Sequence, residues 1–344
     1  MIEVIRPGLQ TTVQDLGRSG SRHLGICQSG ALDDQALKTA NILVGNSMEA
    51  AGLEIATGPV ELECHSDSVL ALTGADFNAS VMTAGSENTK ALALAPGWRF
   101  QLQRGERLLL KGNRNGGRAY IAFAGGLKIA TTLGSCATDI AAGFGGLNGR
   151  CLQSGDQLAI NPPTAEIANS YLTKWPYPKK WDIGCRQTPP GHTIRVLPSN
   201  NAGLFSAVEH QRFFQSDWQI STASNRMGAR LQGATIKTQA GHNRANTVAT
   251  AANLRSHAVI PGTVQVPRNG KPIVLLADGQ TTGGYPKIGQ VIQADLCKLA
   301  QLGFDMMFRF VPCTMVQAIA ARAAQQQELF RLQQAVSYYD GRKR

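Results

Sequence analysis

Short apolar runs alternate with turn-forming residues along most of this chain. Nine such runs, each four to eight residues long, are bounded by Gly, Pro, Asn or Asp, as short β-strands are. They cover residues 68–72, 91–94, 107–110, 119–123, 157–160, 193–197, 259–266, 273–276 and 306–311. Short strands separated by turn signals are typical of barrels and sandwiches rather than of alternating β-α units. We therefore expect a mainly β protein with a few helices.

Three segments instead repeat their apolar residues at helical spacing. The first covers residues 33–44 and is followed by Gly and Asn, which commonly end helices. The second covers residues 288–302. The third begins at Thr314, where Gln317 completes a capping box, and we expect it to fray before Asp340.

Proline divides the chain into two parts. Residues 161–191 hold six of the 15 prolines, and proline removes backbone donors, so this stretch cannot be a central strand. A length of 344 residues also suggests about two domains. We expect an N-terminal, β-rich, barrel-like domain in residues 1–185. We expect a C-terminal β-barrel domain, ending in a helix, in residues 186–344.

Composition narrows the class of protein. A content of 43% hydrophobic and 17% charged residues excludes a disordered chain. No apolar run reaches the roughly 18–20 residues of a membrane span, and the first residues do not look like a signal peptide. We expect a cytoplasmic protein without a membrane partner. The net charge of +11 favours anionic ligands, but the basic residues are scattered, so we expect no nucleic-acid partner.

Several chemical motifs are absent or incomplete. The seven cysteines form no closely spaced ligand pairs, so we expect buried thiols and no metal site. Residues 112–119 have the glycine spacing of a phosphate loop, but Arg118 stands in place of the lysine, so a hairpin turn is the better interpretation. No biotin-attachment motif is present, so we expect no covalent biotin on this chain.

Two polar stretches in the first third of the chain are candidates for a site. In residues 11–18, Asp15 and Arg18 either form a salt-bridged turn or meet one ligand together. Asn41, on the first predicted helix, either caps a loop or points into a site. Glu54 lies between Leu53 and Ile55, and it is either a partly buried carboxylate suited to proton transfer or a surface residue of an edge strand.

Two further polar stretches lie in the second half. In residues 224–231, Arg226 and Arg230 are four apart and could clamp a carboxylate or phosphate between two guanidinium groups, although Arg230 also suits a structural ion pair. Residues 280–282 offer Gln and Thr donors where the predicted helix 288–302 would begin, and a helix N-terminus favours an anion. Nearby His257 is either an acid-base group or a hydrogen-bonded structural residue.

Taken together, these stretches resemble the carboxyltransferase-domain, allophanate-hydrolase-subunit-2-like family. The matching segments follow the family order through nearly the whole chain. They are residues 11–18 (TTVQDLGR), 29–33 (SGALD), 41–46 (NILVGN), 53–55, 72–75 (LTGA), 124–126, 224–231 (SNRMGARL), 261–267 (PGTVQVP) and 280–286 (QTTGGYP). Within the family, Ser256 followed by His257 is similar to the bacterial 5-oxoprolinase branch.

The resemblance implies a fold, an activity and partners. It implies two cyclophilin-like β-barrel domains and a component that helps open 5-oxoproline to glutamate with ATP, acting with separate A and B subunits. It leaves open whether Mg²⁺ takes part and whether ATP is bound mainly by a partner subunit. Phosphorylation would turn the lactam carbonyl oxygen into a leaving group, which requires cations and oriented donors. We expect the site to be shared with the B subunit and the isolated chain to be inactive.

Two other functions stay open. One is a carboxyltransferase component of the urea-amidolyase type, which would use biotin carried by another protein. The other is a regulatory partner that sequesters a kinase-inhibitor protein. For the enzyme, the predicted catalytic residues are Asp15, Glu54 and His257. The predicted residues for binding substrate or phosphate are Gln14, Arg18, Asp33, Asn41, Asn225, Arg226, Arg230, Gln265, Gln280, Thr281, Thr282, Gly283 and Tyr285.

Overall fold

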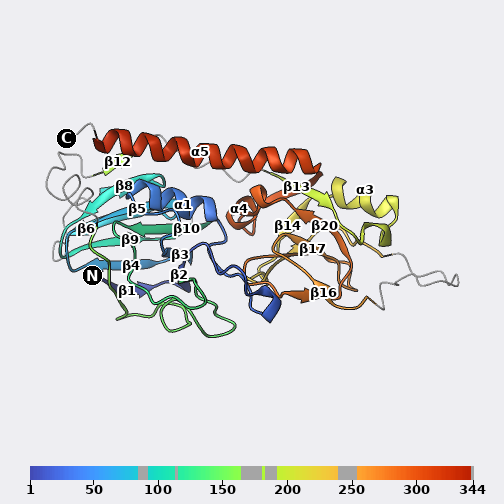
Figure 1. Cartoon of the computed structure of the whole chain (residues 1–344), viewed down its shortest axis with the longest axis horizontal. Coiled ribbons are helices and arrows are strands. Elements are labelled where there is room, and N and C mark those ends of the chain that lie inside the picture. Colours follow the sequence, from blue (N-terminus) through green and yellow to red (C-terminus); the bar gives the residue numbers. More distant parts are fainter. Residues whose placement is uncertain (84–91, 113–114, 164–179, 183–191, 239–253, 342–344) are drawn as a thin grey trace. The chain divides into compact units, whose positions relative to one another are not determined.

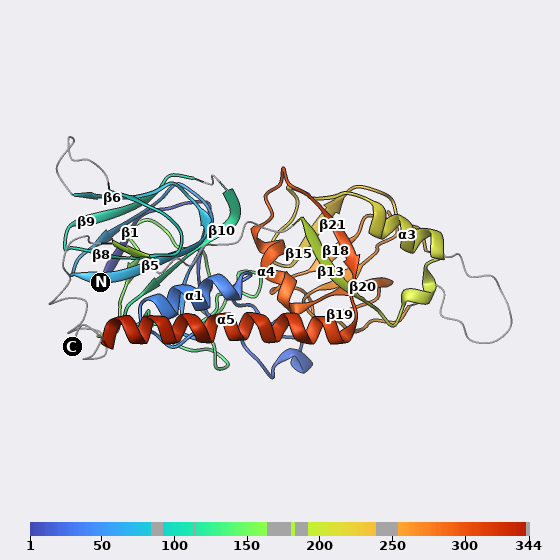
Figure 2. The same ribbon diagram turned by 90° about the horizontal axis from the view of Figure 1, so that it is seen from above.

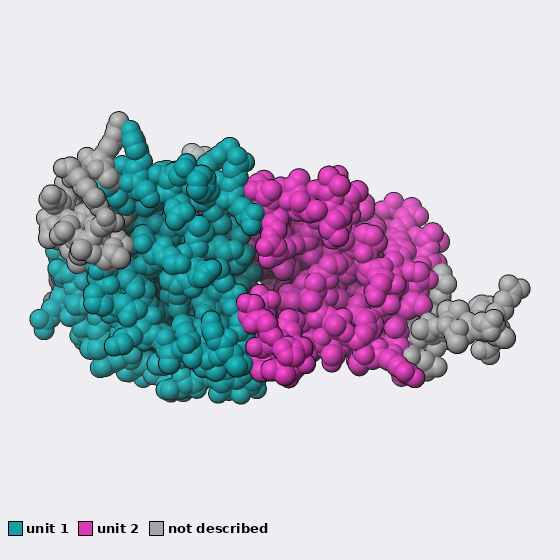
Figure 3. All heavy atoms as spheres, in the orientation of Figure 1, with its two compact units in different colours: residues 1–18, 29–189, 325–344 teal, residues 19–28, 190–324 magenta. Residues whose placement is uncertain are grey.

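The computed structural model describes residues 1–83, 92–112, 115–163, 180–182, 192–238 and 254–341. The chain divides into two compact units (Figure 3). Unit 1 comprises Met1–Arg18, Ser29–Pro189 and Gln325–Arg344, and unit 2 comprises Ser19–Gln28 and Pro190–Ala324. Residues 19–28 thus belong to unit 2, and the last part of the C-terminal helix belongs to unit 1. The expected domains at residues 1–185 and 186–344 stay a prediction.

Unit 1 contains two antiparallel six-stranded sheets (Figure 1). The first consists of β1 (Ile2–Pro7), β4 (Val60–Cys64), β6 (Ala79–Thr83), β7 (Leu92–Leu94), β9 (Glu106–Leu110) and β11 (Gln157–Leu158), in the order β11-β1-β4-β9-β6-β7. The second consists of β2 (Gln10–Gln14), β3 (Gly52–Thr57), β5 (Ser68–Asp76), β8 (Trp98–Leu102), β10 (Asn115–Phe123) and β12 (Lys180–Asp182), in the order β12-β8-β5-β10-β3-β2. Strand β12, within the proline-rich stretch that was not expected to form a central strand, lies at the sheet edge, and residues 164–179 and 183–191 of that stretch lie outside the described residues.

The core of unit 1 lies between these sheets. Strands β4 and β9 alternate buried and half-buried positions, so one face of the first sheet points inward. The second sheet contributes residues such as Leu72, Phe100 and Ile121 to the same core. Its strand β5 is buried at every position from Val69 to Ala75, which means that both faces of this sheet are covered.

Two helices cover the outer face of the second sheet (Figures 1 and 2). They are α1 (Asp34–Leu43) and the unit 1 part of α5 (Met315–Gly341). Leu43 of α1 and Leu329 and Val336 of α5 share an apolar cluster with Ala71 of β5. Thr314 and Gln317 form the predicted capping box at the start of α5. The helix continues to Gly341, so the expected fraying before Asp340 is wrong.

Unit 2 contains a closed barrel of seven strands. They are β13 (Thr193–Pro198), β14 (Trp218–Ile220), β15 (Gly228–Gln232), β17 (Thr263–Gln265), β18 (Ile273–Leu275), β20 (Lys287–Val291) and β21 (Met307–Pro312), in the order β13-β20-β17-β18-β15-β14-β21. The barrel closes because β13 also pairs with β21, in parallel. Beside it, β16 (His257–Ala258) and β19 (Thr282–Gly283) form a two-stranded sheet.

Aromatic residues fill much of the unit 2 core. Helix α3 (Ala207–Gln215) lies against β21 (Figure 2), where Phe213 stacks on Phe310 with ring centroids 4.5 Å apart. The buried Trp218 donates its indole N–H to the Phe213 carbonyl oxygen over 2.9 Å. Helix α4 (Gln293–Gln301) packs near β13, and short 3₁₀ helices cover residues Arg22–Leu24 and Ala202–Leu204.

The expected class, mainly β with a few helices, is confirmed, and so is the helix at residues 33–44. Of the two barrels expected, the one in unit 2 is closed, whereas unit 1 is built from two six-stranded sheets. Two further local expectations are wrong. Residues 288–302 begin as strand β20, because this segment pairs with β13 and β17 in the barrel wall, and the helix starts only at Gln293. Strands β9 and β10 belong to different sheets, so they do not pair as the expected hairpin, and residues 113–114 of the expected turn lie outside the described residues. No helix in the described ranges is long and apolar enough to cross a membrane.

Candidate functional site

The predicted site residues fall into both units, and each group is described within its own unit. Unit 1 holds Gln14, Asp15, Arg18, Asp33, Asn41 and Glu54. Unit 2 holds Asn225, Arg226, Arg230, His257, Gln265, Gln280, Thr281, Thr282, Gly283 and Tyr285.

Asp15 follows β2 and orders a neighbouring loop. Its Oδ1 accepts hydrogen bonds from Ser135 Oγ at 2.7 Å and Gly17 N at 2.8 Å, and its Oδ2 accepts one from Cys136 N at 2.6 Å. Its backbone carbonyl also accepts from Ala31 N at 2.9 Å. These bonds connect the Asp15 carboxylate to its own turn and to the loop at Ser135 and Cys136. They do not include the salt bridge with Arg18 that was one of the two alternatives from the sequence. Burial and the nearby Asp15 carboxylate raise the pKa of the Cys136 thiol.

Arg18 is a buried cation with unused donors. Its side chain is 1% exposed, it donates from Nη2 to the Ala137 carbonyl oxygen, and it stacks over the Phe144 ring at 4.6 Å. Its Nε and Nη1 atoms have no hydrogen-bond partner in the described part of the chain. Gln14 binds the adjoining Thr138 carbonyl through Nε2, while its buried Oε1 is also without a partner there. Two nitrogens of a buried guanidinium with unused N–H groups suit an anionic oxygen, such as a carboxylate or phosphate.

Glu54 lies inside the sheet and not at its edge. Strand β3 runs between β10 and β2, so the alternative of a surface residue on an edge strand is wrong. Its Oε2 accepts hydrogen bonds from Tyr120 Oη and Leu32 N, both at 2.8 Å, and its Oε1 is 3.3 Å from Arg118 Nε. Burial, together with the charges of Glu54 and Asp33, raises the pKa of Tyr120 well above its ordinary value.

Asp33 and Asn41 stabilise the two ends of α1. Asp33 is the N-cap, and its Oδ1 accepts from Ala36 N at 2.9 Å. Asn41 donates from Nδ2 to the Ala50 carbonyl oxygen at 2.7 Å and accepts from Asn46 Nδ2 at 3.1 Å. Of the two alternatives for Asn41, the structure therefore supports the loop cap. Any role of these residues in binding a ligand stays a prediction.

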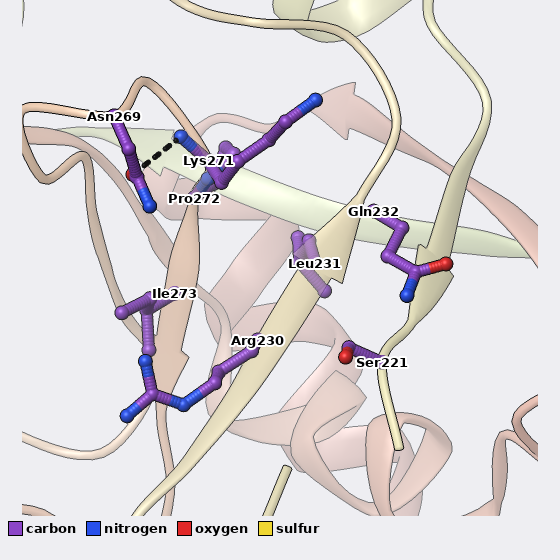
Figure 4. Close-up of a pocket in the computed structure, with 8 residues that line it drawn as sticks. All are labelled: Ser221, Arg230, Leu231, Gln232, Asn269, Lys271, Pro272 and Ile273. Carbon is purple, nitrogen blue, oxygen red and sulfur yellow. Dashed lines mark hydrogen bonds between the residues drawn. The ribbon is translucent and has the colours of Figure 1, made fainter. Parts of the chain in front are cut away.

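The two arginines of residues 224–231 do not form a joint clamp. Arg226 is 3% exposed and makes a bidentate ion pair with Asp278, with Nε–Oδ2 at 2.8 Å and Nη2–Oδ1 at 2.9 Å. Arg230 is exposed on β15 and lines a pocket of about 270 Å³ (Figure 4). Asn225 shapes the turn between them, because its Oδ1 accepts from Met227 N at 2.9 Å.

The loop of residues 280–282 has no helix behind it. Strand β20 follows this loop, so the expected N-terminal helix dipole is absent at this place. Positive charge near this loop comes instead from Arg22, whose Nη2 donates to the carbonyl oxygens of Val259 at 2.6 Å and Gln280 at 3.3 Å. Burial lowers the pKa of Arg22. Thr281 accepts from Val259 N through its carbonyl, and the side chains of Gln280, Thr282 and Tyr285 are exposed.

A second polar cluster joins His257, Gln265 and Gly283 to a lysine that the sequence patterns did not single out. Lys287 is 5% exposed, and its Nζ is hydrogen-bonded to His257 Nε2. Gln265 lies opposite Lys287 in the barrel wall, and His257 pairs with Gly283. The sequence could have indicated this residue, because Lys287 stands at the start of the apolar stretch after Pro286. A lysine in a buried strand is unusual, since lysine is almost never fully buried unless it is paired.

The described residues include no group of three or more His, Cys, Asp or Glu side chains placed to hold a metal ion. The buried charged side chains of the candidate site include Arg18 and Glu54 in unit 1 and Lys287 in unit 2.

Comparison with known proteins gives consistent findings. The family model for the carboxyltransferase domain, subdomain A and B, matches residues 24–312. The chain is 41% identical over 326 residues to the C subunit of the 5-oxoprolinase of Escherichia coli (strain K12), which covers 95% of this chain and 96% of that protein. It is 34% identical over 322 residues to the corresponding 5-oxoprolinase C subunit of Haemophilus influenzae, covering 94% of each chain.

A solved structure shows the same fold. The crystal structure of the Kluyveromyces lactis urea carboxylase is similar with a TM-score of 0.80 and 28% identity, over 96% of this chain. The match takes up 29% of that longer chain.

Proposed function

Because the chain belongs to the carboxyltransferase-domain family, subdomain A and B, we propose that it is a component of an ATP-dependent 5-oxoprolinase. In this proposal it helps to open 5-oxoproline to glutamate together with separate A and B subunits. The observation that carries the proposal is the similarity to the C subunit of a 5-oxoprolinase along nearly the full length of both chains. Relatives that are named as subunits support the view that the active enzyme is an assembly.

The geometry supports a role in binding an anionic cyclic amide. A lactam is a poor electrophile, so its opening needs groups that hold the substrate and stabilise charge on oxygen. In unit 1, two buried nitrogens of Arg18, Nε and Nη1, have unused N–H groups, which suit a carboxylate or a phosphate. In unit 2, Lys287 and Gln265 offer N–H donors beside His257.

Residues 112–118 do not fit a nucleotide phosphate. A phosphate loop leads into a helix whose N-terminal amides hold the anion, whereas here strand β10 follows. In that strand Arg118 lies beside the Glu54 carboxylate. We therefore assign no ATP chemistry to this segment and propose that the nucleotide is bound mainly by a partner subunit.

The test is reconstitution of the complex. The chain is co-expressed with its candidate A and B subunits, and ATP hydrolysis and glutamate formation are measured with and without 5-oxoproline. We expect both to depend on 5-oxoproline and to be lost when any one subunit is omitted. Turnover by this chain alone would contradict the shared site, and a complete assembly without glutamate formation would contradict the proposed function.

The structural similarity to a urea carboxylase favours one second candidate. In that case the chain would transfer a carboxyl group between a urea-type amide and biotin carried on another protein. Activity that requires a biotinylated carrier and is blocked by avidin would support this candidate, whereas 5-oxoproline-dependent turnover in the presence of avidin would exclude it.

A further inference from the structure

Lys287 is a buried cation with an incomplete set of hydrogen-bond partners. It lies in β20, in the wall of the unit 2 barrel, and its side chain is only 5% exposed. Its Nζ contacts His257 Nε2, and among the described residues no carboxylate forms an ion pair with it. Burial lowers the pKa of Lys287, as expected for an ammonium group that has lost much of its hydration.

The hydrogen bonds of His257 leave Lys287 as the group with spare donors. His257 Nδ1 is 3.0 Å from the Arg255 carbonyl oxygen, and a carbonyl can only accept, so Nδ1 carries a proton. In the neutral imidazole, Nε2 is then the acceptor and takes one N–H of Lys287. An ammonium group has three N–H donors, so two others have no partner within the described ranges.

Gln265 brings a second donor to the same place. It lies directly opposite Lys287 in the antiparallel pair of β17 and β20, and side chains at opposite positions lie on the same face. Gln265 is 2% exposed, and its Nε2 has no partner in the described part of the chain. Buried donors without partners are rare in native proteins, and a ligand or an ordered water is the usual explanation.

Gly283 lies next to both His257 and Gln265. Its strand pairs with His257, and a Cβ at position 283 would come within 2.4 Å of Gln265 Nε2. Such an approach is closer than side-chain carbons make, so glycine at this position lets the backbone lie against the Gln265 amide. The cluster therefore draws on four strands, β16, β17, β19 and β20, and the described residues offer no acceptor that uses all donors of the ammonium and the amide.

We propose that Lys287 and Gln265 together bind the carbonyl oxygen of the amide substrate, and that His257 is the positioning residue for Lys287. The choice of a cyclic amide rests on the proposed function. An amide oxygen carries partial negative charge that grows as the amide is opened, and a cation next to a neutral donor suits that charge. The carboxyltransferase alternative would present an amide oxygen of the same kind.

Activity in the assembled complex is the first test. Lys287→Met and Gln265→Met each remove the donors while keeping side-chain length, and Lys237→Met changes an exposed lysine of the same unit as a control. We expect kcat/KM for 5-oxoproline to fall about 10²-fold or more in Lys287→Met and about tenfold in Gln265→Met, but less than about twofold in the control. A fall of less than about threefold in both test variants would overturn the proposal.

The infrared carbonyl band of bound 5-oxoproline, labelled with ¹³C at the ring carbonyl, separates binding from mere structural support. Hydrogen bonds lower this frequency, so we expect the band to lie higher in Lys287→Met than in the wild-type complex. An identical band in both would overturn the proposal even if activity falls. If Lys287→Met does not assemble, the same measurements on Gln265→Met decide. A wild-type complex that binds but does not open 5-oxoproline would contradict the proposed function alone, because the band still tests Lys287.

Discussion

The buried ion pair between Arg226 and Asp278 can be tested as a structural element of unit 2. Both side chains are nearly inaccessible, at 3% and 4% exposure, and two hydrogen bonds of 2.8 and 2.9 Å join them. Arg226 precedes β15 and Asp278 follows β18, and these strands pair with each other. The ion pair therefore closes the end of a two-strand ladder in the barrel.

The magnitude follows from what each substitution leaves behind. Arg226→Met leaves the Asp278 carboxylate buried without its cation, which costs about 3–5 kcal/mol. Because about 1.4 kcal/mol corresponds to a factor of ten, opening of this part of the barrel becomes roughly 10²- to 4 × 10³-fold more frequent. The double variant Arg226→Met/Asp278→Met removes both charges, and such replacements are often neutral or stabilising, so we expect it to recover most of the loss.

Amide hydrogen exchange, read by mass spectrometry on peptides that contain β15 and β18, is the assay. Arg230→Met is the matched control, because that arginine lies four residues further along and is exposed on β15, and we expect a change below about 0.5 kcal/mol. If Arg226→Met exchanges no faster than Arg230→Met, the reasoning is refuted and Arg226 is available for a ligand after all. A double variant as unstable as Arg226→Met would refute the electrostatic explanation.

Two further predictions concern single carboxylates. Burial acts to raise the pKa of Asp295, but hydrogen bonds from Arg195 and Lys298 lower it below its ordinary value. As the pH falls, the Asp295 carboxylate therefore takes up a proton in the unfolded chain before it does so in the folded one. Its contribution to stability is complete above the pKa in the unfolded chain, about 3.9, and is lost as the pH falls through the lower pKa in the folded chain. We expect urea unfolding midpoints of Asp295→Asn to depend less on pH between about 5 and 3 than those of the wild type, and equal slopes would contradict this. Asp33→Ala should lower stability by about 1 kcal/mol through loss of the α1 N-cap, whereas Asp34→Ala, which removes a surface pair with Lys38, should cost less than about 0.5 kcal/mol in the same urea assay.

Local sequence patterns predicted the elements that depend on local chemistry. The helix at residues 33–44 and the capping box at Thr314 were predictable because N-caps and apolar spacing act within a few residues. Most of the apolar runs likewise became strands, since turn formers bound them on both sides. The run at 259–266 is an exception, as only Thr263–Gln265 forms a strand there.

The features that the sequence did not predict depend on contacts with residues far away in the chain. The spacing of Ile288 and Ile292 fits a helix, but pairing with β13 and β17 makes the first part of that segment a strand. Arg226 was expected at a ligand because nothing local indicates Asp278, which lies 52 residues further along.

The same limit applies to the candidate site. Glu54 and Lys287 were ambiguous or overlooked because their burial is decided by sheet order and barrel closure, which no short motif encodes. Family resemblance pointed to these loops as candidates, while the atoms that remain without partners in the described residues became visible only in the folded chain.

The excursion of residues 19–28 into unit 2 limits how this protein can be divided. The chain leaves unit 1 after Arg18 and rejoins it at Ser29, and Arg22 on the excursion holds the carbonyls of Val259 and Gln280. If the gene were divided near codon 190, the N-terminal product would carry the ten residues 19–28, which belong to unit 2. The C-terminal product would lack Arg22, which binds the carbonyl oxygens of Val259 and Gln280. Dividing the gene between the two units would therefore give two incomplete proteins.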